Sequence, residues 1–262
     1  MKRAGIDHEL RVGSSAHYED PRYYADTYRD RTEDVAYYVA LARRTGGPVL
    51  EYGCGEGRIA LPIAREGLDV LGVDQSQPML DALAEKLSAE PREVQRRLKT
   101  RRGDIRALKL AKKFPLVLCT FNTFLHLYDR EDVEQFLARV HAHLAPRGRF
   151  VFDVSTPMPA DLARDPNKAY KLPAVRVNGV KHEYRERFDY DPMRQTLFVM
   201  MEFTKADGEG FVTPLAHRQF FPRELEALLH YNRFSVEKLE GGFRGEPADR
   251  HSDSLVWTCR AR

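Results

Sequence analysis

The chain has 262 residues, a formal net charge of +3, and 42% hydrophobic against 31% charged residues. This length accommodates one α/β domain with room for an inserted lobe. The ordinary balance of apolar and charged residues excludes a disordered protein, and the small net charge does not by itself indicate a nucleic-acid partner.

Cysteine usage and the apolar runs exclude further classes. Cys54, Cys119 and Cys259 are far apart and form neither a C-x-x-C pair nor an iron–sulfur spacing, so we expect no metal site. The start of the chain lacks the apolar core of a signal peptide, and no apolar run is long enough to span a bilayer. We expect a cytoplasmic protein with no membrane partner, either a monomer or a homodimer.

The first expected elements are helical. Residues 17–43 follow a helical pattern that is rich in tyrosine. Pro21 divides this stretch into a short piece and a longer helix, and Gly46-Gly47-Pro48 ends it. The residues before about Gly13 are expected to form a loose tail.

Strands and helices then alternate as far as residue 155. The expected strands cover residues 49–52, 69–74, 98–102, 114–120 and 149–154. The expected helices cover residues 56–66, 76–87 and 129–145. This alternation builds βαβ units, which predict a parallel sheet.

The pattern changes from Thr156 onward. Residues 156–173 are expected to form a loop, and three antiparallel strands should follow it, at residues 182–190, 196–205 and 211–221. Asp191-Pro192 and Asp207-Gly208 supply the turns between these strands. A helix at 222–231 and strands at 235–239 and 255–259 should then resume the core.

Together these elements predict an α/β protein with a doubly wound, seven-stranded Rossmann-like sheet, in which six strands are parallel and one is antiparallel. We expect the sheet core at residues 46–155 and 222–262. We expect an antiparallel β-lobe inserted at 156–221, and a separate helical segment at 1–45.

Glycines and acids follow the ends of the first two expected strands. Glu51 closes the first strand, and Gly53, Gly55 and Gly57 follow it at alternate positions. Glycine permits a sharp turn and lets a ligand approach the backbone. A dinucleotide fingerprint would read G-x-G-x-x-G, whereas here the third glycine comes one position early. Asp74 closes the second strand, about where an acid reaches ribose hydroxyls in nucleotide-binding folds.

Two further segments follow the third and fourth strands: Gly103-Asp104-Ile105 and Phe121–Leu127. In this order, the four signals resemble class I S-adenosylmethionine (SAM) methyltransferases, and most closely the bacterial small-molecule enzymes, over nearly the whole chain. The runs Val49–Met79, Phe121–Leu127 and Arg218–Leu225 match that group, and so do Tyr28 and Arg31.

The resemblance implies SAM as the cofactor and gives roles to individual residues. Glu51 would stand near the methionine amino group, Asp74 would hold the ribose hydroxyls, and Arg31 would pair with the methionine carboxylate. The helical segment would form a lid, and the lobe would cap the substrate. The other implied cofactor contacts are Tyr28, Gly53, Cys54, Gly55, Gln75, Met79, Asp104, Ile105 and Phe121.

The implied reaction is an in-line displacement that moves the methyl group to a nitrogen or oxygen of a small molecule. A neutral amine needs little more than alignment, whereas a hydroxyl needs a base. His126 is the candidate base, because it follows the fourth strand and an ordinary imidazole titrates near neutral pH. The alternative is that His126 packs against the adenosine or a helix. The substrate-contact candidates are Tyr18, Tyr24, Asn122 and His217; some relatives carry an acid at the position of Asn122.

Two other functions remain as alternatives: a nucleic-acid methyltransferase and a non-catalytic SAM-binding protein. The nucleic-acid alternative would use a basic run between residues 92 and 102. However, Thr120-Phe121-Asn122-Thr123 is not the Asn/Asp-Pro-Pro-aromatic motif of enzymes that methylate exocyclic base amines. We expect the basic run to be a solvated helix end and an edge strand. Every cofactor position is filled, so nothing suggests a non-catalytic protein. The preferred partner is a small-molecule methyl acceptor.

Overall fold

The computed structural model describes residues 8–262, which form two compact units. Residues 31–156 and 220–262 form one of them, called the sheet unit here. The second, called the lobe unit, contains residues 157–219 and the N-terminal part of the chain up to Asp30. The helix at 33–45, which the sequence placed in the N-terminal helical segment, therefore lies within the sheet unit.

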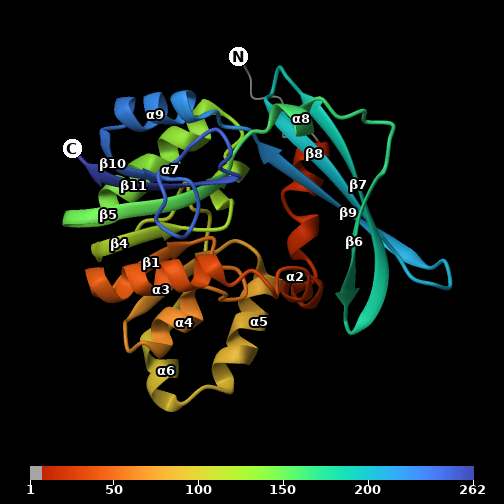
Figure 1. Ribbon diagram of the computed structural model, residues 1–262. Helices are drawn as coiled ribbons and strands as arrows, with labels where there is room; N and C mark the ends of the chain where they lie inside the picture. The colour runs from red at the N-terminus through yellow and green to blue at the C-terminus, as the bar shows by residue number, and fades with distance from the viewer. Residues whose placement is uncertain (1–7) are drawn as a thin grey trace. The chain divides into compact units, whose positions relative to one another are not determined.

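The sheet unit contains a seven-stranded sheet in the order β10-β11-β5-β4-β1-β2-β3 (Figure 1). Every neighbouring pair is parallel except those that include β11, which runs antiparallel to both β5 and β10. The expected six parallel strands and one antiparallel strand are thus confirmed. The strands are β1 Val49–Tyr52, β2 Val70–Asp74, β3 Leu98–Arg102, β4 Phe114–Cys119, β5 Leu144–Ser155, β10 Phe234–Glu240 and β11 Ser254–Ala261.

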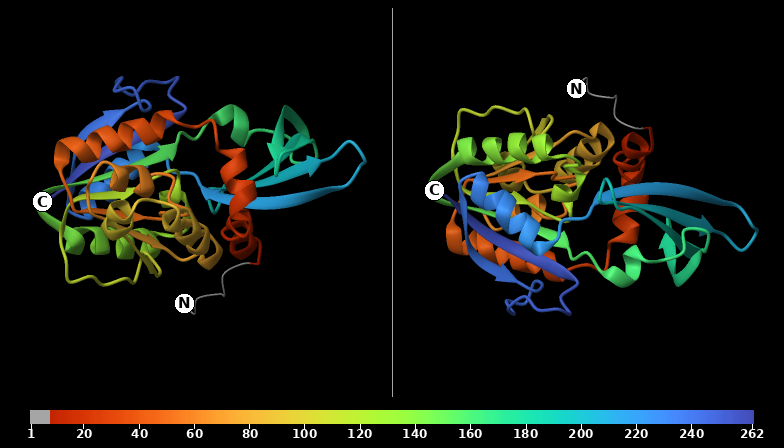
Figure 2. Two further views of the ribbon diagram at one scale, coloured as in Figure 1. Left: turned by 90° about the horizontal axis from the view of Figure 1, so that it is seen from below. Right: turned by 90° about the horizontal axis from the view of Figure 1, so that it is seen from above.

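Helices cover both faces of this sheet. α7 and α9 pack on one face, where Phe136 and Leu225 join the apolar core, and α3, α4 and α5 pack on the other, where Tyr38 and Leu83 are buried (Figures 1 and 2). The helices are α3 Glu33–Thr45, α4 Ala60–Arg65, α5 Gln77–Ser88, α6 Arg92–Arg97, α7 Arg130–His143 and α9 Pro222–Tyr231. This arrangement leaves the carboxyl ends of the parallel strands free to carry the loops of a site.

Helix starts follow their capping residues. The Ser76 side chain accepts a hydrogen bond from the Met79 N–H and so begins α5. The Asp129 side chain accepts a hydrogen bond from the Asp132 N–H and so begins α7. α4 is shorter than the sequence indicated, because the residues from Glu56 to Ile59 form a turn. The glycines in and just before this segment explain the delay, since their left-handed backbone cannot continue a helix.

The lobe unit combines short N-terminal helices with a four-stranded antiparallel sheet in the order β6-β7-β8-β9 (Figure 1). Its helices are α1 His8–Gly13, η1 Ala16–Tyr18, α2 Pro21–Thr27 and α8 Pro159–Leu162. Its strands are β6 Tyr170–Val177, β7 Val180–Asp191, β8 Thr196–Thr204 and β9 Gly210–Arg218.

Two expectations for this unit were wrong. The loose tail expected before Gly13 contains α1 over residues 8–13, while residues 1–7 lie outside the described part of the chain. The loop expected up to Pro173 contains the beginning of β6, so the lobe has four strands rather than three. β6 is an edge strand whose register shifts between Leu172 and Val175, and an edge or a bulge is where a sheet accepts proline.

The basic run lies where the sequence indicated. β3 is one of the two edge strands of the large sheet, and Lys99, Arg101 and Arg102 are exposed on it. Arg97 in the preceding helix pairs with Asp69 at 3.1 Å. Within residues 8–262, no helix is both long and apolar enough to cross a membrane.

Candidate functional site

The glycine loop between β1 and α4 is a tight, left-handed turn. Gly53, Gly55 and Gly57 have φ angles of 69°, 53° and 86°. A Cβ atom on Gly53 would lie 2.4 Å from the Thr123 hydroxyl oxygen, and one on Gly57 would lie 2.3 Å from a Leu83 methyl carbon. Gly53 and Gly57 are therefore required both by backbone conformation and by space.

Asp74 joins the glycine loop to the start of α5. Its Oδ2 atom accepts the Gly55 N–H at 2.8 Å, and its Oδ1 atom accepts the Ser76 N–H at 2.8 Å. Burial raises the pKa of this carboxyl group, although the backbone N–H groups of Ser76, Gly55 and Gln75 oppose the shift. Each carboxylate oxygen has a second lone pair, so Asp74 retains acceptor capacity for a ribose hydroxyl.

Three neighbours of the loop differ in what they can offer a ligand. The Cys54 thiol is buried against Gly72, where an added Cβ would lie 2.8 Å from the sulfur, and burial raises its pKa. Only the backbone of Cys54 is therefore available for the predicted contact. Met79 is buried beneath Gly55, whereas Gln75 is exposed.

Glu51 is a buried acid with one unused oxygen. Its Oε1 atom accepts the Thr120 hydroxyl at 2.8 Å, while Oε2 is buried with no hydrogen-bond partner among the described residues. Burial raises the pKa of Glu51 to about 8, against the opposing influence of Thr120 and Arg58. A buried polar atom without a partner is costly, and an ammonium donor would satisfy it. This atom therefore fits the amino group of the SAM methionine.

Two arginines meet at the aromatic ring of Phe121. The guanidinium carbon of Arg58 lies 4.4 Å from the ring centroid, and that of Arg31 lies 5.0 Å from it. Arg58 is neutralised by buried Asp34 through hydrogen bonds of 2.9 and 2.5 Å. No acid in the described part of the chain pairs with Arg31, so its charge fits an external carboxylate. No role was predicted for Arg58 from the sequence, where its only signal was a cation directly after the glycine loop.

Asp104 is less available than the resemblance implied. The Arg106 guanidinium hydrogen-bonds to both of its oxygens and holds the pKa of this carboxyl group below its usual value. Arg106 also bonds to Asp132 at 2.6 Å. Ile105 packs partly buried against the core next to this pair. Contact of Asp104 with an adenine amino group stays a prediction, in which the amino group would share the carboxylate with Arg106.

His126 lies in the short helix η2, Thr123–His126, and its environment does not suit a base. Its Nδ1 atom is 3.1 Å from the Tyr128 hydroxyl, and burial lowers the pKa of His126 to about 4. The expectation that His126 titrates near neutral pH was therefore wrong. The imidazole is neutral at pH 7 and binds a proton only weakly.

The other predicted substrate contacts divide between the two units. Asn122 is in the sheet unit, where its side chain bonds to Ser155. Tyr18 and Tyr24 are in the lobe unit with His217, which faces Leu197 across β8 and β9. Tyr28, predicted as a cofactor contact, is also in the lobe unit.

The lobe tyrosines surround a histidine for which the sequence predicted no role. His17 is buried, and its ring centroid lies 5.3 to 5.6 Å from those of Tyr18, Tyr24 and Tyr28. Its Nε2 atom is 2.8 Å from the Tyr28 hydroxyl oxygen. The one available signal was a histidine placed directly before the tyrosine-rich stretch.

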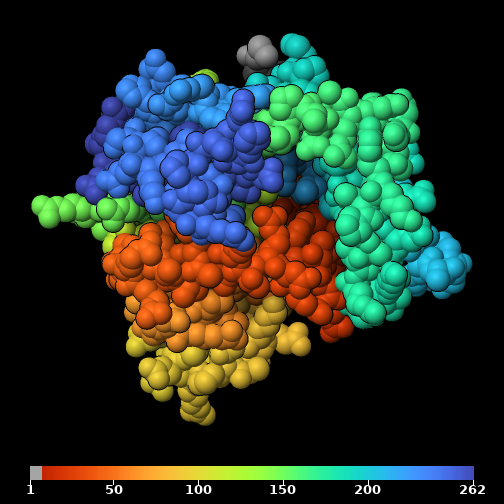
Figure 3. Space-filling view, in the orientation of Figure 1, coloured from red at the N-terminus to blue at the C-terminus, as the bar shows by residue number. Residues whose placement is uncertain are grey.

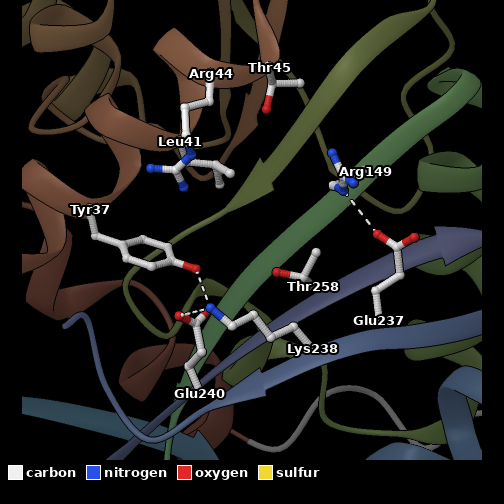
Figure 4. A pocket seen from close by; sticks show the side chains of 9 residues that line it. All are labelled: Tyr37, Leu41, Arg44, Thr45, Arg149, Glu237, Lys238, Glu240 and Thr258. Atoms are coloured by element: carbon white, nitrogen blue, oxygen red, sulfur yellow. Dashed lines mark hydrogen bonds and ion pairs between the residues drawn. The ribbon is translucent and has the colours of Figure 1, made fainter. Parts of the chain in front are cut away.

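Two pockets on the surface of the sheet unit are defined by the residues that line them. One, of about 490 Å³, lies beside α3 and β10; in Figure 3 the orange surface of residues 33–45 borders blue surface from the C-terminal part of the chain. Its charged groups are largely paired: Glu240 accepts from Tyr37 at 2.7 Å and from Lys238 at 2.6 Å, and Arg149 pairs with Glu237 at 2.9 Å (Figure 4). None of the predicted site residues lines it. The second pocket, of about 640 Å³, includes Arg31 and the loop 241–254.

Comparison with known sequences identifies the protein family to which the chain is similar. A family model described as a methyltransferase domain matches residues 49–148. The chain is 32% identical to a probable S-adenosylmethionine-dependent methyltransferase of Mycolicibacterium smegmatis over 240 residues, which cover 90% of this chain and 72% of that protein. It is also 32% identical over 123 residues to cypemycin N-terminal methyltransferase from a Streptomyces species. That match spans about half of each protein, 47% of this chain and 48% of the relative.

Solved structures agree with this assignment. The CcbJ methyltransferase from Streptomyces caelestis superposes with a TM-score of 0.75 at 26% identity, covering 88% of this chain and 96% of that one. A SAM-dependent methyltransferase from Clostridium acetobutylicum shares the fold at a TM-score of 0.72 and 17% identity, covering 91% and 96%. Sequence, sheet order and glycine loop therefore agree, and the chain belongs to the class I SAM-dependent methyltransferases.

Proposed function

We propose that this chain transfers a methyl group from SAM to a nitrogen atom of a small-molecule acceptor. The observation that carries the proposal is the buried, unpartnered Oε2 atom of Glu51 beside a loop of three left-handed glycines. A carboxylate in this position complements the ammonium group of an amino-acid-like ligand, and the loop admits that ligand close to the backbone.

Three side chains would hold the cofactor by charge and hydrogen bonding. Glu51 would accept from its ammonium group, Arg31 would pair with its carboxylate, and Asp74 would accept from its ribose hydroxyls. When bound, SAM supplies a methyl group that is already activated by a sulfonium. The chain therefore has to align the acceptor and exclude water, and needs no covalent intermediate of its own.

The low pKa of His126 favours a nitrogen atom over an oxygen atom as the methyl acceptor. A neutral amine attacks with its own lone pair and loses its proton afterwards, whereas a hydroxyl must lose its proton as it attacks. An imidazole with a pKa of about 4 is a poor acceptor for that proton at neutral pH. Relatives of both kinds exist, including a glycine/sarcosine N-methyltransferase of Parasynechococcus marenigrum and a ubiquinone biosynthesis O-methyltransferase of Rickettsia canadensis. Methylation at oxygen is therefore the second candidate.

The acceptor contacts proposed from the sequence remain Tyr18, Tyr24, Asn122 and His217, and the lid and capping roles of residues 1–45 and 156–221 remain proposals with them. Aromatic and hydroxyl groups of this kind suit a small organic acceptor that carries an amine. Nucleic-acid methylation is less well supported, because the exposed cations of β3 lie on an edge strand and Arg97 of the preceding helix already pairs with an acid.

Calorimetry tests the cofactor, and a methylation screen tests the acceptor. We expect SAM and S-adenosylhomocysteine to bind and NAD not to bind; binding of NAD alone would overturn the assignment. A screen with labelled SAM against amines, amino sugars, phenols and RNA should label amines first. Labelling of RNA, or of phenols only, would contradict the nitrogen acceptor. SAM binding with no turnover on any acceptor would favour the non-catalytic alternative.

A further inference from the structure

The turn after β4 contains two consecutive non-glycine residues in the left-handed region. Phe121 has a φ of 52° and Asn122 a φ of 64°. Asparagine tolerates this conformation, but a bulky aromatic residue does so rarely, and such strain persists only where the surroundings enforce it. The chain therefore needs contacts that hold Phe121 in place.

Those contacts come from the end of β5. The Oδ1 atom of Asp153 accepts the Phe121 N–H at 2.8 Å and the Tyr38 hydroxyl at 2.6 Å. Two residues later, the Ser155 N–H donates to the Asn122 side-chain oxygen at 2.7 Å, and Asn122 Nδ2 donates back to the Ser155 hydroxyl at 2.9 Å. Both left-handed residues are thus fixed from a strand 32 and 33 positions later in the chain.

An acid at position 153 is otherwise hard to explain. Asp153 is 4% exposed in a strand whose neighbours Phe152 and Val154 are fully buried, and burial raises its pKa. Burying a carboxyl group is costly unless its hydrogen bonds offset the desolvation. The two donors that Asp153 binds are the Phe121 backbone and the hydroxyl of an α3 residue, so the buried carboxyl group serves to join these segments.

We propose that Asp153 is a positioning residue of the methyl-donor site: by holding the Phe121 backbone in the left-handed turn, it fixes the aromatic ring on which the Arg31 guanidinium rests. The proposal builds on the SAM-binding function proposed above. Arg31 forms no ion pair with an acid among the described residues, and the face of the Phe121 ring, 5.0 Å from its guanidinium carbon, is a contact that orients its charge. Without the turn, the carboxylate-binding arginine would lose its support.

Three variants separate this role from general stability. D153A removes the acceptor for the Phe121 N–H, whereas D153N keeps an oxygen that can accept it. V256A is the matched control, because Val256 is the buried register partner of Asp153 on β11 and makes none of these hydrogen bonds. Each variant is measured by SAM calorimetry, by thermal unfolding, and by hydrogen exchange of the Phe121 amide in the ligand-free protein.

We expect D153A to weaken SAM binding by on the order of 10- to 100-fold, the range for losing a hydrogen bond to a charged group, and to lose protection of the Phe121 amide. D153N should retain protection and bind SAM within about threefold of the parent, as a neutral acceptor still holds the turn. V256A should lower the unfolding temperature with SAM affinity unchanged. Equal SAM affinity in D153A and the parent, or equal losses in D153A and D153N, would overturn the proposal.

Two further outcomes separate a failure of the proposed SAM-binding function from a failure of the role proposed for Asp153. If the parent protein binds no SAM, the proposed function fails, while amide protection still reports whether Asp153 holds the turn. If D153A does not fold, Phe121→Leu tests the other end of the contact. It keeps the backbone bond to Asp153 but removes the aromatic face, so it should weaken SAM binding with the amide still protected. Unchanged SAM affinity in that variant would equally refute the proposal.

Discussion

Glu51→Gln tests the electrostatics of the cofactor site most directly. Burial raises the pKa of Glu51 from its usual 4.5 to about 8, so the ionised form is disfavoured in the ligand-free protein by roughly 5 kcal/mol. Because the folded state binds this proton more tightly than the unfolded chain, Glu51 lowers stability as pH rises from about 4.5 to about 8. The glutamine amide cannot ionise, yet its oxygen can still accept the Thr120 hydroxyl, so Glu51→Gln should remove this pH dependence.

Binding of SAM reverses the preference, since an ammonium group at Oε2 stabilises the carboxylate. At pH 7 about nine-tenths of a group with a pKa near 8 is protonated, so SAM binding should release close to one proton from Glu51. The affinity for SAM should then rise about tenfold for each pH unit between about 6 and 7.5.

Calorimetry in buffers of different ionisation enthalpy measures the released proton directly. The parent protein should show a buffer-dependent heat at pH 7, and Glu51→Gln should bind SAM more weakly with that component abolished. Glu56→Gln is the control, because Glu56 is a buried acid of the same loop that pairs with Lys86. Its proton release should match the parent. A SAM affinity that is flat from pH 6 to 8, with no buffer dependence, would refute the reasoning.

Three further variants test other parts of the site. Arg31→Ala should weaken binding of SAM by about tenfold or more, because a charge-assisted hydrogen bond to the methionine carboxylate is lost. Calorimetry with decarboxylated SAM should show no such loss. An equal loss for both ligands would exclude the carboxylate contact. Gly57→Ala should destabilise the fold by about 1–3 kcal/mol in chemical denaturation, because its Cβ would lie 2.3 Å from Leu83. In a Leu83→Ala background the same Gly57→Ala change should cost less than in the parent, because the clashing methyl carbon is gone; an equal cost in both backgrounds would contradict the clash. His126→Ala should leave the pH profile of amine methylation unchanged between pH 6 and 8, and loss of a limb of the profile would restore His126 as the base.

The amino-acid sequence by itself determined the architecture of the sheet unit, and its resemblance to a known family implied the cofactor. Apolar runs such as Phe114–Cys119 read as strands because they are buried on both faces, and Pro78 and Ser76 begin a helix by local chemistry alone. The left-handed glycine loop is equally local, as only glycine accepts those angles without strain. These features depend on neighbouring residues, so no tertiary knowledge was needed to predict them.

Only the tertiary structure decided how the charges and strained positions are used. The support of Phe121 by Asp153 spans 32 positions, and that of Asp153 by Tyr38 spans 115, so no local pattern could indicate either. The low pKa of His126 arises from burial, which a spacing in the sequence does not report. Likewise β6 is a strand because β7 is there to pair with it, despite its proline. Desolvation and pairing partners are properties of the folded chain, and they decide which of the predicted residues can act as a base, an anchor or a support.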